Sequence, residues 1–343
     1  MISTLTFLLN QTWFIALMGV ALIGAVLSAV HHSEVIAHKT GEPYGTLILA
    51  LSITIIEVSL IIAMMFDGHE GSEFIARDSV FATVMIVISG VIGLCIIVGG
   101  FKHHVISFHN EGTNSALAVL TALATFVLVM PMVTVSTPGP DFTTSQLAMA
   151  GIASFVLYAA FIFFQTVSHR DYFLPQAEDK KTDLTIHAVK PSHLKTTVSV
   201  LLLALSLVMV VGLAEALSPA IEAAVKAANA PRAVIGIAIA FLVLMPEGFA
   251  AVRAARANRL QSSLNLALGS ALASIGLTIP VVAAVALFFN LPLSLGISAL
   301  NMTLMYLAIF ICALTLATGR TTLLQGAVLV ISFFEFMFLS LVP

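Results

Sequence analysis

The chain has 343 residues, of which 59% are hydrophobic and only 9% are charged, and its mean hydropathy is +1.09. These values exclude an ordinary soluble domain, in which roughly a quarter of the residues are charged. The formal net charge of −3 and the lack of a basic cluster in the sequence also argue against a nucleic-acid partner.

Apolar segments follow one another along almost the whole chain. A membrane-spanning helix needs ~20 mostly apolar residues, and it must be helical because its backbone polar groups find no partners in lipid. The first segment lacks a basic N-terminal region and a cleavage site, so we expect a retained helix and not a signal peptide. In chain order, the predicted spans are 12–30, 44–66, 79–101, 115–135, 146–166, 196–217, 232–252, 264–288, 293–315 and 322–342.

One extended polar stretch divides these spans five and five. We expect a first five-helix repeat at 1–166, a linker loop at 167–195 and a second repeat at 196–343. Because five is an odd number, the second repeat must cross the membrane in the opposite sense. The predicted fold class is therefore an all-α polytopic membrane protein of about ten helices in two inverted repeats. In secondary transporters of this kind the binding site lies near the midplane, where the repeats meet.

The distribution of Lys and Arg predicts the orientation. All 14 of these residues except Arg77, Lys226 and Arg232 fall in the odd-numbered connections or at their edges. Basic residues are retained on the cytoplasmic side of a membrane. We therefore expect a multi-pass protein of a bacterial inner membrane, with the linker loop in the cytoplasm and both termini in the periplasm.

Two glutamates in apolar segments are candidate functional residues. Among the 17 Asp and Glu residues, only Glu57, Glu215, Glu247 and Glu335 fall inside the predicted spans. Glu215 and Glu335 lie nearer the outer ends of their spans, which favours a packing role. Glu57 is close to the middle of its span, and Glu247 follows Pro246 deep in another.

No Lys, Arg or His lies deep in any span to pair with Glu57 or Glu247. A charge at the bilayer centre costs ~2.5–3.5 kcal/mol or more. Each carboxylate must therefore bind a cation, take up a proton or face water, and these three options are the states of a proton-coupled cation site. A protonated glutamate that only packs between helices is the alternative for each.

The side chains around the two glutamates offer oxygen ligands. Hard cations such as Ca²⁺ prefer carboxylates, carbonyls and water, and no thiolate or imidazole cluster is present for a transition metal. We expect no cofactor besides the transported ion. Five polar side chains of the second and eighth spans are possible secondary ligands: Ser52, Thr54, Asn265, Ser270 and Ser274. The alternative is that they only make packing contacts between helices.

The ten histidines all lie in loops or at the ends of spans. They could form a pH sensor or a patch that captures cations on the cytoplasmic side. They could equally be ordinary histidines of the membrane interface.

Two stretches resemble the signatures of ChaA-type calcium/proton antiporters, which belong to the calcium:cation exchanger superfamily. The first is Gly41-Glu42-Pro43-Tyr44-Gly45 continuing through Ile56-Glu57-Val58-Ser59-Leu60, and the second is Pro246-Glu247-Gly248 followed by Asn265-Leu266 and Gly269-Ser270. The resemblance implies the exchanger fold, with a site between the second, third, seventh and eighth spans. It also implies that Glu57 and Glu247 bind the transported cation and shuttle protons. That cation would be Ca²⁺, and bacterial ChaA-type members also exchange Na⁺ and K⁺.

Three positions depart from the pattern of relatives. Thr54 and Leu244 stand where vacuolar relatives have Asn, and Ala273 stands where many have Gln. Ion selectivity therefore stays open.

The predicted function is secondary active cation/proton antiport, with Ca²⁺ exported in exchange for protons. Na⁺/H⁺ or K⁺/H⁺ antiport at the same site is the alternative. A third hypothesis is an intramembrane enzyme that uses the two carboxylates as acid and base. An aspartyl dyad normally uses Asp, however, and no Asp lies in any predicted span, so we predict a transporter and not an enzyme. The expected partners are membrane lipid and small inorganic cations, and the sequence does not specify an oligomeric state.

Overall fold

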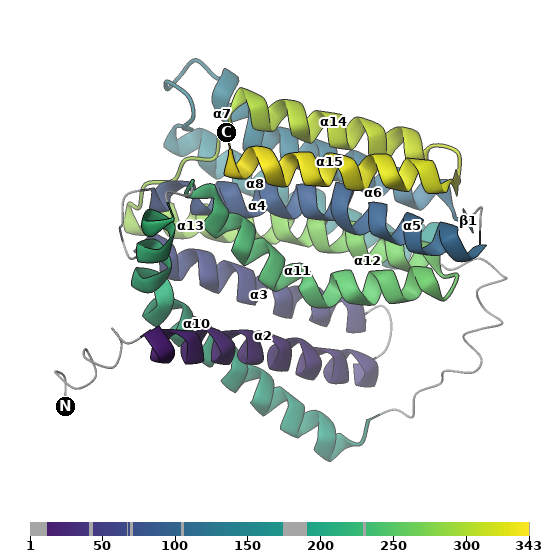
Figure 1. Cartoon of the computed structure of the whole chain (residues 1–343), viewed down its shortest axis with the longest axis horizontal. Coiled ribbons are helices and arrows are strands. Elements are labelled where there is room, and N and C mark those ends of the chain that lie inside the picture. The colour runs from purple at the N-terminus through teal and green to yellow at the C-terminus, as the bar shows by residue number, and fades with distance from the viewer. Residues whose placement is uncertain are drawn as a thin grey trace.

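The computed structural model describes residues 12–40, 44–66, 68, 71–103, 106–173, 191–228 and 231–342. Part of the predicted linker, residues 174–190, lies outside this described part. Long helices run nearly parallel to one another through the molecule (Figure 1), as expected for a chain whose apolar segments satisfy their own backbone.

The first half of the chain forms five long helices, three of them built from several consecutive elements. The third contains a 3₁₀ turn and a π-helical turn, the fourth and fifth each contain a π-helical turn, and a short 3₁₀ helix follows the fifth. The elements are α2 (Thr12–Thr40), α3 (Tyr44–Phe66), η1 (Ser72–Phe74), α4 (Ile75–Met85), η2 (Ile86–Val91), α5 (Ile92–His103), α6 (Asn110–Ala124), η3 (Thr125–Val129), α7 (Met130–Val133), α8 (Thr144–Phe163), η4 (Phe164–Ser168) and η5 (Arg170–Phe173).

The second half repeats this plan, again with a π-helical turn inside its third long helix. Its elements are α10 (His193–Ala227), α11 (Ala233–Arg256), α12 (Leu260–Ala273), η6 (Ser274–Thr278), α13 (Ile279–Phe289), α14 (Ala299–Leu316) and α15 (Leu323–Leu341). A two-residue antiparallel pair, β1 (Ile106–Ser107) with β2 (Arg320–Thr321), joins loops of the two halves.

The helix lengths confirm the predicted membrane-spanning fold. Among the described residues, nine helices are long and apolar enough to cross a membrane. The tenth is α3, whose 23 residues rise about 35 Å at 1.5 Å per residue, more than the ~30 Å of a bilayer core. The ten long helices form two inverted five-helix repeats.

The predicted ends of four spans were wrong. The third was placed at 79–101, but its helix begins at Ser72, and the ninth was placed at 293–315, but α14 begins at Ala299. The first span was placed at 12–30, but α2 continues to Thr40, and the sixth was placed at 196–217, but α10 covers His193–Ala227. Hydropathy marks where apolar residues stop, whereas a helix continues until a residue breaks it. No Gly or Pro follows Gly24 before Gly41, so α2 extends beyond its apolar part.

The first helices of the two repeats pack along each other. Ser28 and Ser206 share a hydrogen bond of 2.9 Å between their hydroxyls, and His32 Nδ1 lies 3.3 Å from Ser199 Oγ. α2 and α10 therefore form a pair at one side of the molecule (Figure 1). One cluster of buried apolar side chains joins this pair to α3, and a larger one fills the space among the remaining helices. α11 contributes buried residues to both clusters, so it lies at the boundary between the two parts.

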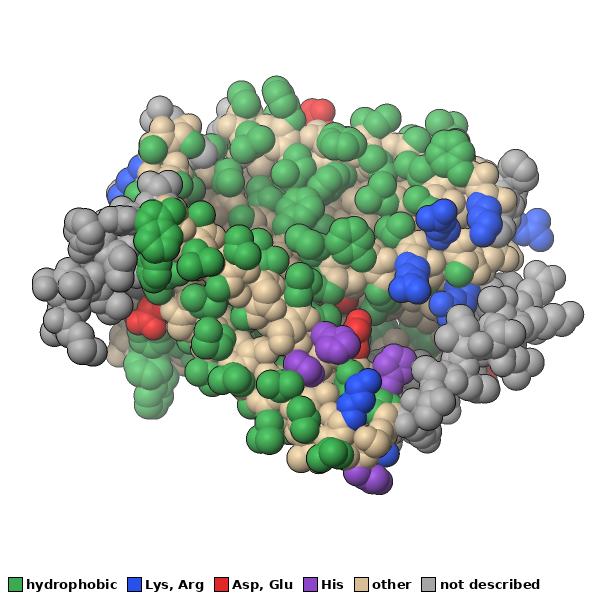
Figure 2. Space-filling view, turned by 60° about the horizontal axis from the view of Figure 1, so that its bottom comes forward, with side chains coloured by type: hydrophobic (Ala, Val, Ile, Leu, Met, Phe, Trp, Pro, Cys, Tyr) green, Lys and Arg blue, Asp and Glu red, His purple; other side chains and the backbone are tan. Residues whose placement is uncertain are grey.

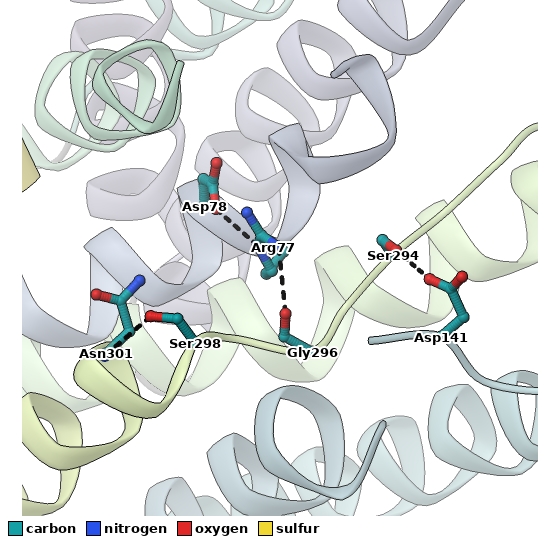
Figure 3. A network of polar contacts seen from close by, with 7 residues as sticks. All are labelled: Arg77, Asp78, Asp141, Ser294, Gly296, Ser298 and Asn301. Atoms are coloured by element: carbon teal, nitrogen blue, oxygen red, sulfur yellow. Dashed lines mark hydrogen bonds and ion pairs between the residues drawn. The ribbon is translucent and has the colours of Figure 1, made fainter. Parts of the chain in front are cut away.

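A polar network holds the extended segment between α13 and α14 (Figure 3). Arg77 pairs with Asp78 at 2.7 Å and also donates to the Gly296 carbonyl at 3.2 Å. Ser294 donates to the Asp141 carboxylate. The segment is thereby tied to both α4 and the loop that precedes α8, which fixes one end of the helical core.

Candidate functional site

Glu57 is buried in the middle of α3, with 3% of its surface exposed. Its carboxylate accepts two hydrogen bonds: Ser274 Oγ donates to Oε1 at 2.6 Å, and Thr278 Oγ1 donates to Oε2 at 3.2 Å. Both donors come from η6, where residues four apart lie on the same side of the helix. A π-helical turn of the second repeat therefore holds the carboxylate of the first.

Glu247 is buried in α11, with 7% of its surface exposed. It directly follows Pro246, a proline inside the helix. α3 packs against α11, and the charge of Glu57, together with Ser270 on α12, acts on the Glu247 carboxyl, so the two carboxyls lie near each other. The Oε2 atom of Glu247 is buried without a partner in the described part of the chain. A buried polar group without a partner costs free energy, and this oxygen is therefore available to a ligand.

Neither glutamate forms an ion pair with a Lys, Arg or His of the described part of the chain. An isolated carboxylate in a low-dielectric interior is far less stable than one in water. The pair must therefore be neutralised by protons or by a metal cation, and it could exchange one for the other.

The burial of the other two membrane glutamates differs. Glu215 on α10 and Glu335 on α15 are both exposed. Neither is brought into the pair formed by Glu57 and Glu247.

Two hydroxyls predicted as possible ligands lie on the same helix as Glu57. Ser52 donates to the Ile48 carbonyl at 2.8 Å, and Thr54 donates to the Ala50 carbonyl at 2.9 Å. Both residues are buried. Their single protons are used within α3, and their oxygens can still accept a bond or coordinate a cation.

Asn265 is placed elsewhere. Its amide nitrogen donates to the Phe173 carbonyl at 2.6 Å, and its amide oxygen accepts from Gln261 at 3.0 Å. Nine residues separate Asn265 from Ser274, which is about 13 Å along a helix. The amide nitrogen therefore joins α12 to η5, the amide oxygen is bonded within α12, and the structure does not bring Asn265 to the glutamates.

Glu34 was missed by the sequence analysis. It lies on the extension of α2 beyond residue 30, its side chain is exposed, and its charge acts on Glu247. The sequence does contain a signal for it: no Gly or Pro lies between Gly24 and Gly41, so the helix could have been expected to continue through Glu34.

The donors around the two glutamates are oxygen atoms, which hard cations prefer. In the described part of the chain, no three or more His, Cys, Asp or Glu side chains gather closely enough to hold a metal ion. A Ca²⁺ ion takes six to eight oxygen ligands in most proteins. At Glu57 and Glu247 the remaining ligands would therefore be hydroxyls, carbonyls and water.

Comparison with known proteins shows the family of the chain. The model of the family described as sodium/calcium exchanger protein matches residues 10–167 and 198–342. The chain is 47% identical over 322 residues to the putative ionic transporter y4hA of Sinorhizobium fredii, covering 94% of this chain and 87% of the relative. It is 36% identical over 316 residues to the sodium-potassium/proton antiporter ChaA of Escherichia coli, covering 91% and 85%.

Two solved structures share the fold. The structure of native YfkE superposes with a TM-score of 0.74 at 18% identity, covering 96% of this chain and 92% of that one. The crystal structure of the H⁺/Ca²⁺ exchanger CAX gives a TM-score of 0.66 at 13% identity, covering 98% and 84%.

Proposed function

The chain belongs to the sodium/calcium exchanger protein family, and from this premise we propose that it exchanges Ca²⁺ for protons at Glu57 and Glu247. It is a multi-pass membrane cation/proton antiporter, and hence a transporter and not an enzyme. One observation supports the proposed site above all: two buried carboxyls from different repeats lie near each other, and neither has a basic partner among the described residues.

The proposed exchange follows from charge neutrality. Two ionised carboxylates carry two negative charges, which one Ca²⁺ or two protons can balance. Ser274 and Thr278 hold the Glu57 carboxylate from one side, while the partnerless Oε2 of Glu247 can accept the incoming ion. Because the charged empty pair is unstable in a dry interior, the site changes sides only when it is occupied. That requirement couples cation movement to proton movement.

The orientation belongs to the same proposal. The distribution of Lys and Arg supports a cytoplasmic linker and periplasmic termini. The bacterial relative ChaA supports an inner-membrane location. In this orientation Ca²⁺ enters from the cytoplasm and protons enter from the periplasm.

Monovalent cation antiport is the second candidate. The relative from Escherichia coli is named a sodium-potassium/proton antiporter and shares 36% of the aligned residues. Two carboxylates and several hydroxyls can also coordinate Na⁺ or K⁺, since these are hard cations that prefer oxygen.

The test compares the ions side by side. Purified protein is reconstituted into liposomes that contain a pH-sensitive dye, and a gradient of Ca²⁺, Na⁺ or K⁺ is applied. We expect Ca²⁺ to drive proton flux, and the double variant Glu57→Gln, Glu247→Gln to abolish that flux. Flux with Na⁺ or K⁺ alone would favour the second candidate. Ca²⁺-driven flux that persists in the double variant would refute the site.

A further inference from the structure

The cytoplasmic end of α2 carries a polar strip that the exchange mechanism above does not use. His31, Glu34 and His38 are three and four residues apart, so they lie on one face of the helix. All three side chains are exposed. Figure 2 turns the side with α2 and α10 toward the viewer and shows histidine side chains around an acidic one, next to a recess. Further toward the N-terminus, the exposed positions of the same face are apolar and include Val20 and Leu27.

Glu34 lies on a helix that packs against the helix of Glu247. α2 contacts α11, and the charge of Glu34 acts on the Glu247 carboxyl. Glu34 is exposed, whereas Glu247 is buried and has an oxygen without a partner. α2 thus carries an accessible carboxylate whose charge acts on an inaccessible one that can take a ligand.

We propose that Glu34 captures the incoming cation at the cytoplasmic end of α2 and passes it to Glu247. This inference rests on the proposed function. Repulsion between two ionised carboxylates is relieved when a cation comes between them, so the approach to Glu247 is favourable for positive ions. Charges of one sign at an entrance raise the association rate of the opposite ion by 10–10³-fold.

The strip is suited to brief capture and not to storage. Three or more groups able to hold a metal ion do not gather around Glu34 in the described residues. A cation held by one carboxylate and water can leave quickly, as transport requires. Glu57 lacks this role because it is buried, with 3% of its surface exposed.

The test measures each membrane face separately. Glu34→Gln removes the charge, Glu34→Asp keeps it, and Glu215→Gln is a matched control on α10, whose glutamate is also exposed. Wild type and variants are reconstituted in one orientation, and the half-saturating Ca²⁺ concentration for proton exchange is measured from each face. For Glu34→Gln we expect a rise of roughly tenfold at the cytoplasmic face and none at the other. Glu34→Asp and Glu215→Gln should match the wild type.

Salt provides a second readout. The Debye length is about 8 Å at physiological ionic strength and about 3 Å at 1 M, so the difference between wild type and Glu34→Gln should shrink as an inert salt is added. An equal rise at both faces, no rise at all, or a loss in Glu34→Asp as large as that in Glu34→Gln would overturn the inference. Absence of Ca²⁺ exchange in the wild type would instead refute the proposed ion, and the same two-face measurement would then use Na⁺ or K⁺.

Discussion

Ser274 donates a 2.6 Å hydrogen bond to Glu57, across 217 positions of the chain. The donor opens η6 in the second repeat, and the acceptor lies in the middle of α3 in the first. The bond therefore joins the two repeats at the site itself. It also aims one carboxylate while the other keeps an oxygen free.

Loss of this bond should weaken cation binding. Hydrogen bonds to charged groups contribute about 1.5–3 kcal/mol, and 1.4 kcal/mol corresponds to a factor of ten in affinity. We expect Ser274→Ala to raise the half-saturating cation concentration roughly tenfold or more. Thr278→Val should have a smaller effect, because its bond is longer at 3.2 Å. Titration of cation-driven proton flux in liposomes would show which variant has the larger effect on the half-saturating cation concentration. A larger effect of Thr278→Val would contradict the prediction.

Much of this architecture could be predicted from residues alone. The ten apolar segments were sufficient to predict the membrane-spanning helices, because a segment in lipid must hydrogen-bond its own backbone groups. Glu57 and Glu247 stood out because no basic residue accompanied them. Both side chains are buried in the structure, and their role in transport stays a proposal.

Position along a helix was harder to predict than residue type. Ser274 and Asn265 were both selected as oxygen donors in the same span. One contacts Glu57, and the other is bonded to Phe173 and Gln261. Which donor reaches the glutamate depends on how α12 and η6 cross α3, and that is set by packing between segments distant in sequence. Glu34 was missed for a different reason, since hydropathy does not mark the end of a helix.

Neutral variants of the pair should separate function from stability. Glu247→Gln is expected to abolish cation-driven proton flux, because an amide cannot exchange a proton or balance a metal ion. It should not lower the melting temperature of the protein in detergent, because it removes an ionisable group that is buried with a partnerless oxygen.

Glu335→Gln provides the control for this substitution. The side chain is exposed on α15, and the same chemical change there should leave flux intact. Full flux in Glu247→Gln, or its loss in Glu335→Gln, would contradict the assignment of the buried pair.

Asn265→Ala should affect stability and not ion affinity. The substitution removes the 2.6 Å bond to the Phe173 carbonyl and leaves that carbonyl and Gln261 with one partner fewer. We expect the free energy of unfolding to fall by about 1–2 kcal/mol. Thermal unfolding in detergent and the half-saturating cation concentration would be measured together. A change confined to cation affinity would instead show that Asn265 serves as a ligand.

Gly236 should tolerate no larger side chain. A Cβ at this position would lie 2.7 Å from backbone and side-chain atoms of Asp78, so glycine is what allows α4 and α11 to come this close here. Eleven residues separate Gly236 from Glu247, which is close to three helical turns, so both lie on nearly the same face of α11. The close contact with α4 therefore lies on nearly the same face of α11 as the buried carboxylate.

Gly236→Ala is therefore expected to lower the free energy of unfolding by about 1–3 kcal/mol through overpacking. Gly212→Ala in α10 is the matched control, because nothing lies within 4 Å of a Cβ there. That variant should be neutral or more stable by up to about 1 kcal/mol, since alanine favours a helix over glycine. The midpoints of thermal unfolding in one detergent would compare the two. Equal midpoints would mean that α4 and α11 can separate at Asp78 without cost, which would contradict the close packing inferred at Gly236.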